Sequence, residues 1–180
     1  MEQPSRAKGL LLSDSDIGTR FGCMNVTSDD LILLGHAGSG VLGILAALWV
    51  FVETLGESNA GRTRVAAFLT ALFMVIAWVL GGFWYLHDYP ADKAVILKGP
   101  WPFAHNVFME TKEHLFFLTL LLSLYLPIAC GDHLFANRVA RRMVLWVSAL
   151  IILSGLGIEG AGAVINHGAK LAIEQTRAKP

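Results

Sequence analysis

Four long apolar stretches constrain the fold of this chain more than any other feature. They cover about residues 31–55, 64–87, 103–129 and 143–171, and short polar segments separate them. A helix needs roughly 20 mainly apolar residues to cross the hydrocarbon core of a bilayer, so each stretch is long enough to span one. Only helices and closed barrels satisfy their own backbone hydrogen bonds in lipid. We therefore expect an all-α integral membrane protein, folded as an antiparallel four-helix transmembrane bundle.

The composition agrees with this class. Of the 180 residues, 54% are hydrophobic and 16% are charged, and the mean hydropathy is +0.56, values typical of membrane proteins. The 14 basic and 14 acidic residues cancel, so no nucleic-acid partner is indicated. We expect the lipid bilayer as the main partner. One membrane domain, 31–171, should lie between a polar N-terminal tail, 1–30, and a C-terminal tail, 172–180.

The connections between the stretches differ in character. Residues 88–102 contain three prolines, and we expect a stiff loop there. The two short turns on the other side carry most of the basic residues close to helix ends, namely Arg62, Arg64, Arg138, Arg141 and Arg142. The positive-inside rule places such turns in the cytoplasm. We therefore expect both termini on the non-cytoplasmic side, in the inner or plasma membrane of a bacterium.

Ionisable residues are concentrated in one half of the predicted bundle. At about 1.5 Å per residue, His36 and Glu110 lie about 10 Å from the middle of their apolar stretches, Glu159 about 8 Å and His114 about 5 Å. All four lie toward the N-terminal tail, as does Tyr85 near the end of the second stretch. Ionisable groups in a membrane are costly and usually face a bundle interior or a water-filled cavity. We expect the two histidines and two glutamates to face a common site.

Local spacing supports this expectation. Glu110 and His114 are four residues apart and therefore share one helix face. His36 lies among small residues, with Gly40 and Gly43 following at four and seven positions. Small residues beside an imidazole allow a flat macrocycle to approach it. The cluster is therefore suited to a bound cofactor.

Three kinds of chemistry fit these residue types. The first is a haem b bound by His36 and His114, with Glu110 and Glu159 orienting the imidazoles or accepting protons from a quinol. The second is a non-haem Fe, Cu or Zn ion bound by all four side chains, although the spacings of familiar metal motifs are missing. The third needs no cofactor: a proton-relay, quinone-interacting or structural subunit of a larger membrane complex.

The first chemistry gives the main functional prediction, a membrane redox protein that carries out electron transfer or quinol chemistry. His36 and His114 would bind the cofactor, and Glu110, Glu159 and Tyr85 would act on protons. A non-haem metal enzyme and a cofactor-free subunit remain open alternatives. A buried hydrogen-bond network that only ties three helices together is the structural alternative.

Overall fold

The computed structural model describes residues 28–57, 59–131 and 133–177, and these residues are almost entirely helical. The helical segments in chain order are α2 (Ser28–Leu55), α3 (Ala60–His87), α4 (Tyr89–Lys98), the π-helix η2 (Ala104–Met109), α5 (Glu110–Ala129), the short 3₁₀ helix η3 (Leu134–Ala136) and α6 (Arg138–Arg177). Among the described residues, four spans are long and apolar enough to cross a membrane: Leu31–Leu55, Ala60–His87, Ala104–Ala129 and Arg138–Gln175. Over the part of the chain that the structure describes, the prediction of an all-helical fold with four helices of this kind is confirmed.

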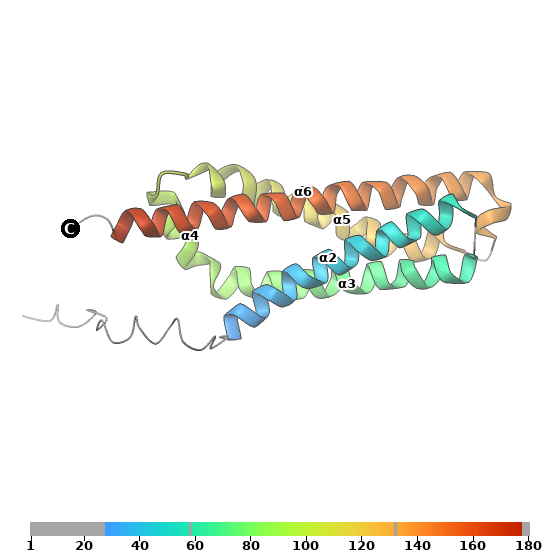
Figure 1. The fold of residues 1–180 in the computed structure, drawn as a ribbon, viewed down its shortest axis with the longest axis horizontal. Coiled ribbons are helices and arrows are strands. Elements are labelled where there is room, and N and C mark those ends of the chain that lie inside the picture. The colour runs from blue at the N-terminus through green and yellow to red at the C-terminus, as the bar shows by residue number, and fades with distance from the viewer. Residues whose placement is uncertain (1–27, 58, 132, 178–180) are drawn as a thin grey trace, which may run out of the picture.

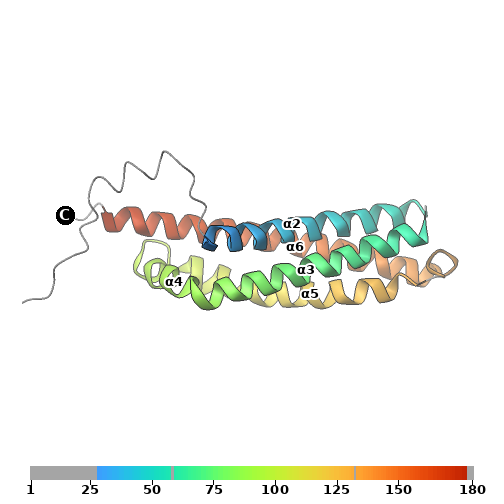
Figure 2. The same cartoon turned by 90° about the horizontal axis from the view of Figure 1, so that it is seen from below.

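The long helices lie side by side over most of their length (Figures 1 and 2). Helix α2 packs along α3 and α6, and α5 packs against both α3 and α6, so that each long helix has two neighbours. The α2–α3 and α5–α6 connections lie together at one end, which we call the turn end. The short helix α4 lies at the opposite end, which we call the cap end (Figure 1). Near the turn end the interior is filled by small and medium apolar side chains, including Ala47, Val50, Ala66, Ala67, Leu126, Val144 and Ile151.

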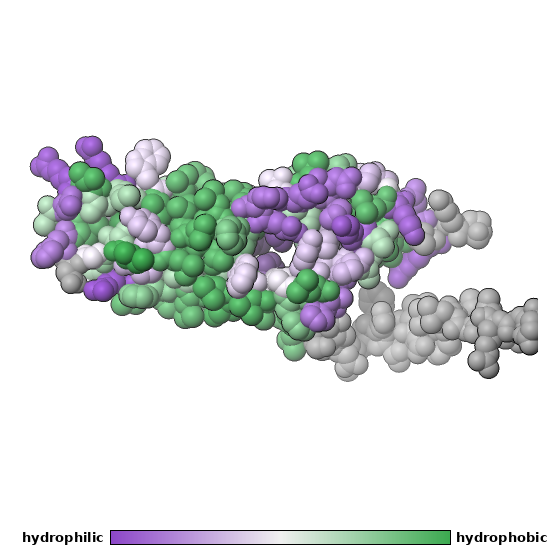
Figure 3. Space-filling model, turned by 180° about the vertical axis from the view of Figure 1, so that it is seen from behind, coloured by the Kyte–Doolittle hydropathy of each residue, from purple (hydrophilic) through white to green (hydrophobic). Residues whose placement is uncertain are grey.

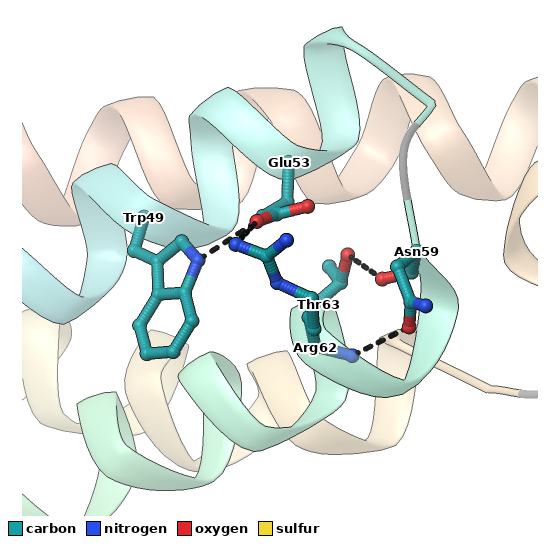
Figure 4. A network of polar contacts seen from close by, with 5 residues as sticks. All are labelled: Trp49, Glu53, Asn59, Arg62 and Thr63. Atoms are coloured by element: carbon teal, nitrogen blue, oxygen red, sulfur yellow. Dashed lines mark hydrogen bonds and ion pairs between the residues drawn. The ribbon is translucent and has the colours of Figure 1, made fainter.

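A polar network stabilises the turn end (Figure 4). Glu53 is only 7% exposed, and its carboxylate accepts a hydrogen bond from Trp49 Nε1 at 3.0 Å and pairs with Arg62 at 2.7 Å. Asn59 caps the first turn of α3, because its side chain accepts a hydrogen bond from the Arg62 amide. This cap starts α3 at Ala60, earlier than the predicted residue 64.

The stiff loop predicted for residues 88–102 is wrong, because most of this segment is the helix α4. Pro90 lies in the first turn of α4, where the missing N–H has no intrahelical acceptor to lose. Tyr89 and Ile96 are each 1% exposed and form a small core with Ala104, Met109 and Ile165. This second core lies between α4, η2 and α6, so α4 closes the cap end.

Candidate functional site

A pocket of 650 Å³ lies in the cap half of the fold, between α2, α3, α5 and α6 and beneath α4. The seven polar side chains that line it are His36, Tyr85, Asp92, Lys112, Glu113, Glu159 and Asn166. Its apolar walls include four large aromatic side chains, Trp78, Trp84, Phe116 and Phe117. A pocket of this size, mainly apolar with a few convergent polar groups, is typical of a small-molecule site.

The His36 imidazole lies tightly against α3. Its Nδ1 is 2.8 Å from the Ala77 carbonyl oxygen, and because a carbonyl only accepts, Nδ1 must carry the hydrogen. A Cβ at Gly81 would lie 2.6 Å from both Nδ1 and Cε1 of the ring, so only glycine leaves room for it. The Phe116 ring lies 6.4 Å from the imidazole, centre to centre. In the neutral ring, Nε2 is then the unprotonated nitrogen, which can accept a proton or bind a metal.

Glu159 reaches the pocket from α6 in a similar way. A Cβ at Gly40 would lie 2.7 Å from its Oε1, so glycine on α2 makes space for the carboxylate. Lys112 on α5 is close enough for its ammonium to interact with the Glu159 charge. The Lys112 Nζ also lies 3.5 Å from the Cβ position of Gly162, one turn further along α6. The pocket thus holds an acid and a base of opposite charge.

A second acid is held at the edge of the pocket near α4. The Glu113 carboxylate lies close enough to the Tyr85 hydroxyl to interact with it. Tyr85 stacks on Tyr89, with ring centres 5.3 Å apart, and the Tyr89 hydroxyl is hydrogen-bonded to His105 Nδ1 at 2.9 Å. Burial raises the pKa of Tyr89 to about 12, and Tyr85 and Glu113 add to this effect, so the hydroxyl stays neutral. An aromatic and hydrogen-bonded column therefore joins Glu113 to the buried His105.

Asp92 is the remaining carboxylate that lines the pocket, and it comes from α4. Burial raises the pKa of Asp92, and the nearby Asp88 adds a smaller effect of the same sign. Both causes disfavour the charged form of the side chain. The surroundings of Asp92 therefore make a negative charge on this side chain less favourable than it would be in water.

The structure does not bring the four predicted ligands together. His36 and Glu159 line the pocket, as does Tyr85, whereas Glu110 and His114 line a shallow depression on the outside of α5. The His114 ring donates from Nδ1 to its own helix, to the Glu110 carbonyl oxygen at 2.7 Å. The predicted common site of two histidines and two glutamates is therefore wrong for Glu110 and His114.

The error has a simple physical cause. Glu110 and His114 do share one face of α5, as predicted, but that face points away from the other helices. The inward face carries Lys112 and Phe116 together with the buried hydroxyl residues Thr119 and Ser123. These four positions recur at helical spacing, and small hydroxyl residues often mark helix contacts in membrane proteins. That stripe is the sequence signal that points to Lys112 as a pocket residue.

The predicted metal site is likewise not formed. Within residues 28–57, 59–131 and 133–177, no group of three or more His, Cys, Asp and Glu side chains could hold a metal ion. In addition, His114 lies outside the pocket that contains His36, so the two do not present their rings to one haem. Comparison with protein-family models, curated protein sequences and solved structures found no match.

Proposed function

We propose that this chain crosses a membrane as an antiparallel four-helix bundle and binds a ligand of the quinone class in its pocket, in proton-coupled redox chemistry. The observation that carries the proposal is the pocket itself. Aromatic walls surround an imidazole, an ammonium and carboxylates in the half of the fold away from the turns. In such a site a flat apolar ring can pack against the aromatic walls, and its oxygen atoms can form hydrogen bonds with the polar side chains.

The surface of the long helices supports the membrane placement. Large apolar side chains point outward from all four, among them Leu45, Phe68, Leu72, Leu121, Trp146 and Leu150. Figure 3 shows an apolar band over the half nearer the turn end on the face formed by α3, α4 and α5. Arginines of the turn end favour the cytoplasmic side for that end, which puts the pocket in the outer leaflet.

The polar groups suit both oxidation states of a quinone. A quinone carbonyl oxygen needs a donor, which Lys112 supplies. A quinol hydroxyl needs an acceptor, which His36 supplies through Nε2, because Nδ1 is already committed to Ala77. Glu159 and Glu113 would then exchange the two protons that accompany quinone reduction or quinol oxidation, and the two electrons would pass between the bound ligand and a separate redox protein. The proton-transfer role predicted for Glu159 is retained in this proposal, and Tyr85 would relay protons to and from Glu113 beside it.

The ligand would enter from the lipid. Trp78 and Gly82 on α3 and Phe117 on α5 line the pocket and are also exposed on the outer surface. Nothing lies within 4 Å of the Cβ position of Gly82, so open space adjoins the pocket there. In Figure 3, hydrophilic residues gather around a hollow on this face, where the apolar band ends. An opening of this kind favours a ligand that is dissolved in the bilayer.

Haem remains a second candidate because of one observation. A histidine that binds a metal through Nε2 commonly donates Nδ1–H to a backbone carbonyl, as His36 does to Ala77. The haem would then have a single imidazole ligand, since His114 lies on another face. A reduced-minus-oxidised visible spectrum of the purified protein separates the two candidates, because haem gives Soret and alpha bands and a quinone does not.

The main test is ligand binding in lipid nanodiscs. A short-chain benzoquinone should bind saturably and quench tryptophan fluorescence, because Trp78 and Trp84 line the pocket. His36→Gln should weaken binding about tenfold, the value of one good hydrogen bond. The matched control is His133→Gln, an exposed histidine at the turn end, which should leave affinity unchanged. Absence of saturable binding to the wild-type protein would refute the proposal.

A further inference from the structure

The cap end holds a buried tyrosine–histidine pair that the proposed quinone chemistry does not use. Tyr89, the first residue of α4, is 1% exposed, and His105 in the π-helix η2 is 6% exposed. The Tyr89 hydroxyl and His105 Nδ1 are 2.9 Å apart, which is a hydrogen-bond distance. Ile96, Met109 and Ile165 belong to the same small core. Apolar side chains therefore shield this hydrogen bond from solvent.

The phenol is the donor in this hydrogen bond. Among the described residues, the Tyr89 hydroxyl makes no other hydrogen bond, so its hydrogen has no second acceptor. A buried hydroxyl hydrogen without an acceptor costs free energy, and donation to Nδ1 removes that cost. Nδ1 then carries no hydrogen of its own, and the neutral ring has its hydrogen on Nε2. His105 thus directs a basic nitrogen at the phenol.

The wide turn of η2 accounts for the position of His105. Hydrogen bonds in a π-helix run from residue i to residue i+5, so residues about four to five apart lie on the same side. The buried side of η2 consists of Ala104, His105 and Met109. Such turns occur frequently at functional sites. The η2 turn therefore places His105 inside the cap end, against the start of α4.

Two aromatic rings connect the pair to the pocket. Trp84 and Tyr85 both line the pocket, and their ring centres lie 5.4 Å and 5.3 Å from that of Tyr89. The Tyr85 and Tyr89 rings are nearly parallel, with 19° between their planes. Aromatic rings at these separations are in direct contact. An electron can therefore pass between Tyr89 and the pocket through adjoining rings.

We propose that Tyr89 is a redox-active side chain, which gives one electron to a peroxyl-type radical in the pocket and its phenolic proton to His105. An oxidised phenol is a far stronger acid than the phenol itself, so the O–H bond breaks and the proton moves to Nδ1. The products on the chain are a neutral tyrosyl radical and an imidazolium. The peroxyl radical takes up the electron and, with a proton from solvent, becomes a hydroperoxide.

The surroundings of Tyr89 favour this coupled route over simple ionisation. Burial raises the pKa of Tyr89 to about 12, so the phenol keeps its proton near neutral pH until it is oxidised. The inference goes beyond the proposed function, because it uses the aromatic lining of the pocket but neither a quinone nor the membrane placement. The two proposals can therefore fail separately.

Flash oxidation of the purified full chain in detergent tests the proposal. Laser excitation of tris(bipyridine)ruthenium(II) with a cobalt(III) quencher gives a ruthenium(III) oxidant that is strong enough for tyrosine. Optical and electron paramagnetic resonance spectra should show a long-lived neutral tyrosyl radical. Tyr89→Phe keeps the ring and should abolish this signal. Tyr125→Phe is the matched control and should preserve it, because the Tyr125 hydroxyl donates to Met143 Sδ, which is not a base. An equal signal in Tyr89→Phe and the wild type overturns the proposal, as does its loss in Tyr125→Phe.

A substitution of His105 tests the proton acceptor. The amide in His105→Gln can accept the hydrogen bond of the phenol but cannot take its proton. The rate of radical formation should therefore fall at least about tenfold, and an unchanged rate overturns the role of His105.

The wild-type radical gives a readout that needs no substitution in the core. After exchange into deuterium oxide, electron–nuclear double resonance should detect a deuteron between the Tyr89 oxygen and His105 Nδ1, and its absence overturns the proposal. Quinone binding in nanodiscs is measured separately. A protein that binds the quinone but forms no Tyr89 radical overturns this inference alone. A protein that forms the radical but binds no quinone supports this inference and overturns the proposed function.

Discussion

The imidazole of His36 occupies space that exists only because residue 81 is glycine. A Cβ there would lie 2.6 Å from Nδ1 and from Cε1 of the ring, well inside van der Waals contact. Gly81→Ala should therefore displace the ring and break its 2.8 Å hydrogen bond to Ala77. We expect a loss of about 1–3 kcal/mol in the free energy of unfolding and at least about tenfold weaker quinone binding. Thermal unfolding and ligand titration in nanodiscs measure the two effects.

The adjacent glycine provides the control for this substitution. A Cβ at Gly82 would meet nothing within 4 Å. Gly82→Ala should therefore leave His36 in place and stabilise α3 slightly, by up to about 1 kcal/mol, because alanine is the better helix former. If both alanine variants bound the ligand equally well, the steric relationship between Gly81 and His36 would not control the site.

The charges of Lys112 and Glu159 should be energetically coupled. Lys112→Met removes the ammonium but keeps a chain of similar length, and it leaves the half-buried Glu159 carboxylate without that favourable interaction. We expect the double variant Lys112→Met/Glu159→Gln to lose less free energy of unfolding than the sum of the losses in the two single variants. The difference, which is the coupling energy, should be about 1 kcal/mol. The free energies of unfolding of the wild type, the two single variants and the double variant, measured in the same detergent, complete this double-mutant cycle. Glu174→Gln, at an exposed acid near the end of α6, should combine with Lys112→Met additively.

Much of the fold follows from sequence because long apolar stretches have few alternatives. Their length and composition predict helices that are long and apolar enough to cross a membrane, and the polar residues in one half of the predicted bundle mark the half that contains the pocket. His36, Glu159 and Tyr85 do line one pocket, as depth and residue type indicate. Helix α4 was missed, because three prolines suggest a loop unless the first is recognised as a first-turn residue.

The orientation of α5 is the part that depth alone cannot predict. Depth depends on residue number, whereas facing depends on rotation about the helix axis, and a run as apolar as 115–129 gives little hydrophobic contrast between its sides. Only the hydroxyl residues Thr119 and Ser123 distinguish the inward side. The close contacts at Gly40 and Gly81 cannot be predicted from the sequence either, because they depend on which residue of another helix lies opposite each glycine.

The free energy of unfolding should depend on pH through Asp92. Burial, followed by the influence of Asp88, raises the pKa of this carboxyl group in the folded state. Below the unfolded-state pKa of about 3.9, the carboxyl group is protonated in both the folded and the unfolded state. The raised pKa of the folded state therefore has no effect on the free energy of unfolding there. Stability is then lost as pH rises from there through the folded pKa. Asp92→Asn should therefore raise the melting temperature at pH 7 but leave it nearly unchanged near pH 3.5.

An exposed acid gives the comparison for the pH effect. Glu174→Gln should leave the melting temperature close to that of the wild-type protein at both pH values, since the side chain is exposed in the last turns of α6. A stabilisation by Asp92→Asn that is the same at pH 3.5 and pH 7 would show that the gain comes from packing or hydrogen bonding. In that case the titration of Asp92 would not be its cause.

Arg141 should stabilise the turn end through the backbone of another helix. From α6 it donates Nε to the Thr54 carbonyl at 3.2 Å and a terminal nitrogen to the Leu55 carbonyl at 3.1 Å, and it pairs with Glu57. These carbonyls end α2 and have no intrahelical partner, and a cation there also interacts favourably with the helix dipole. Arg141→Ala should cost about 1–2 kcal/mol in the free energy of unfolding. Arg141→Lys should recover only part of this, because an ammonium lacks the planar fork that reaches both carbonyls. The exposed neighbour Arg142→Ala should change the free energy by less than about 0.5 kcal/mol, and equal effects at the two arginines would mean that total charge, and not the α2 cap, stabilises this end.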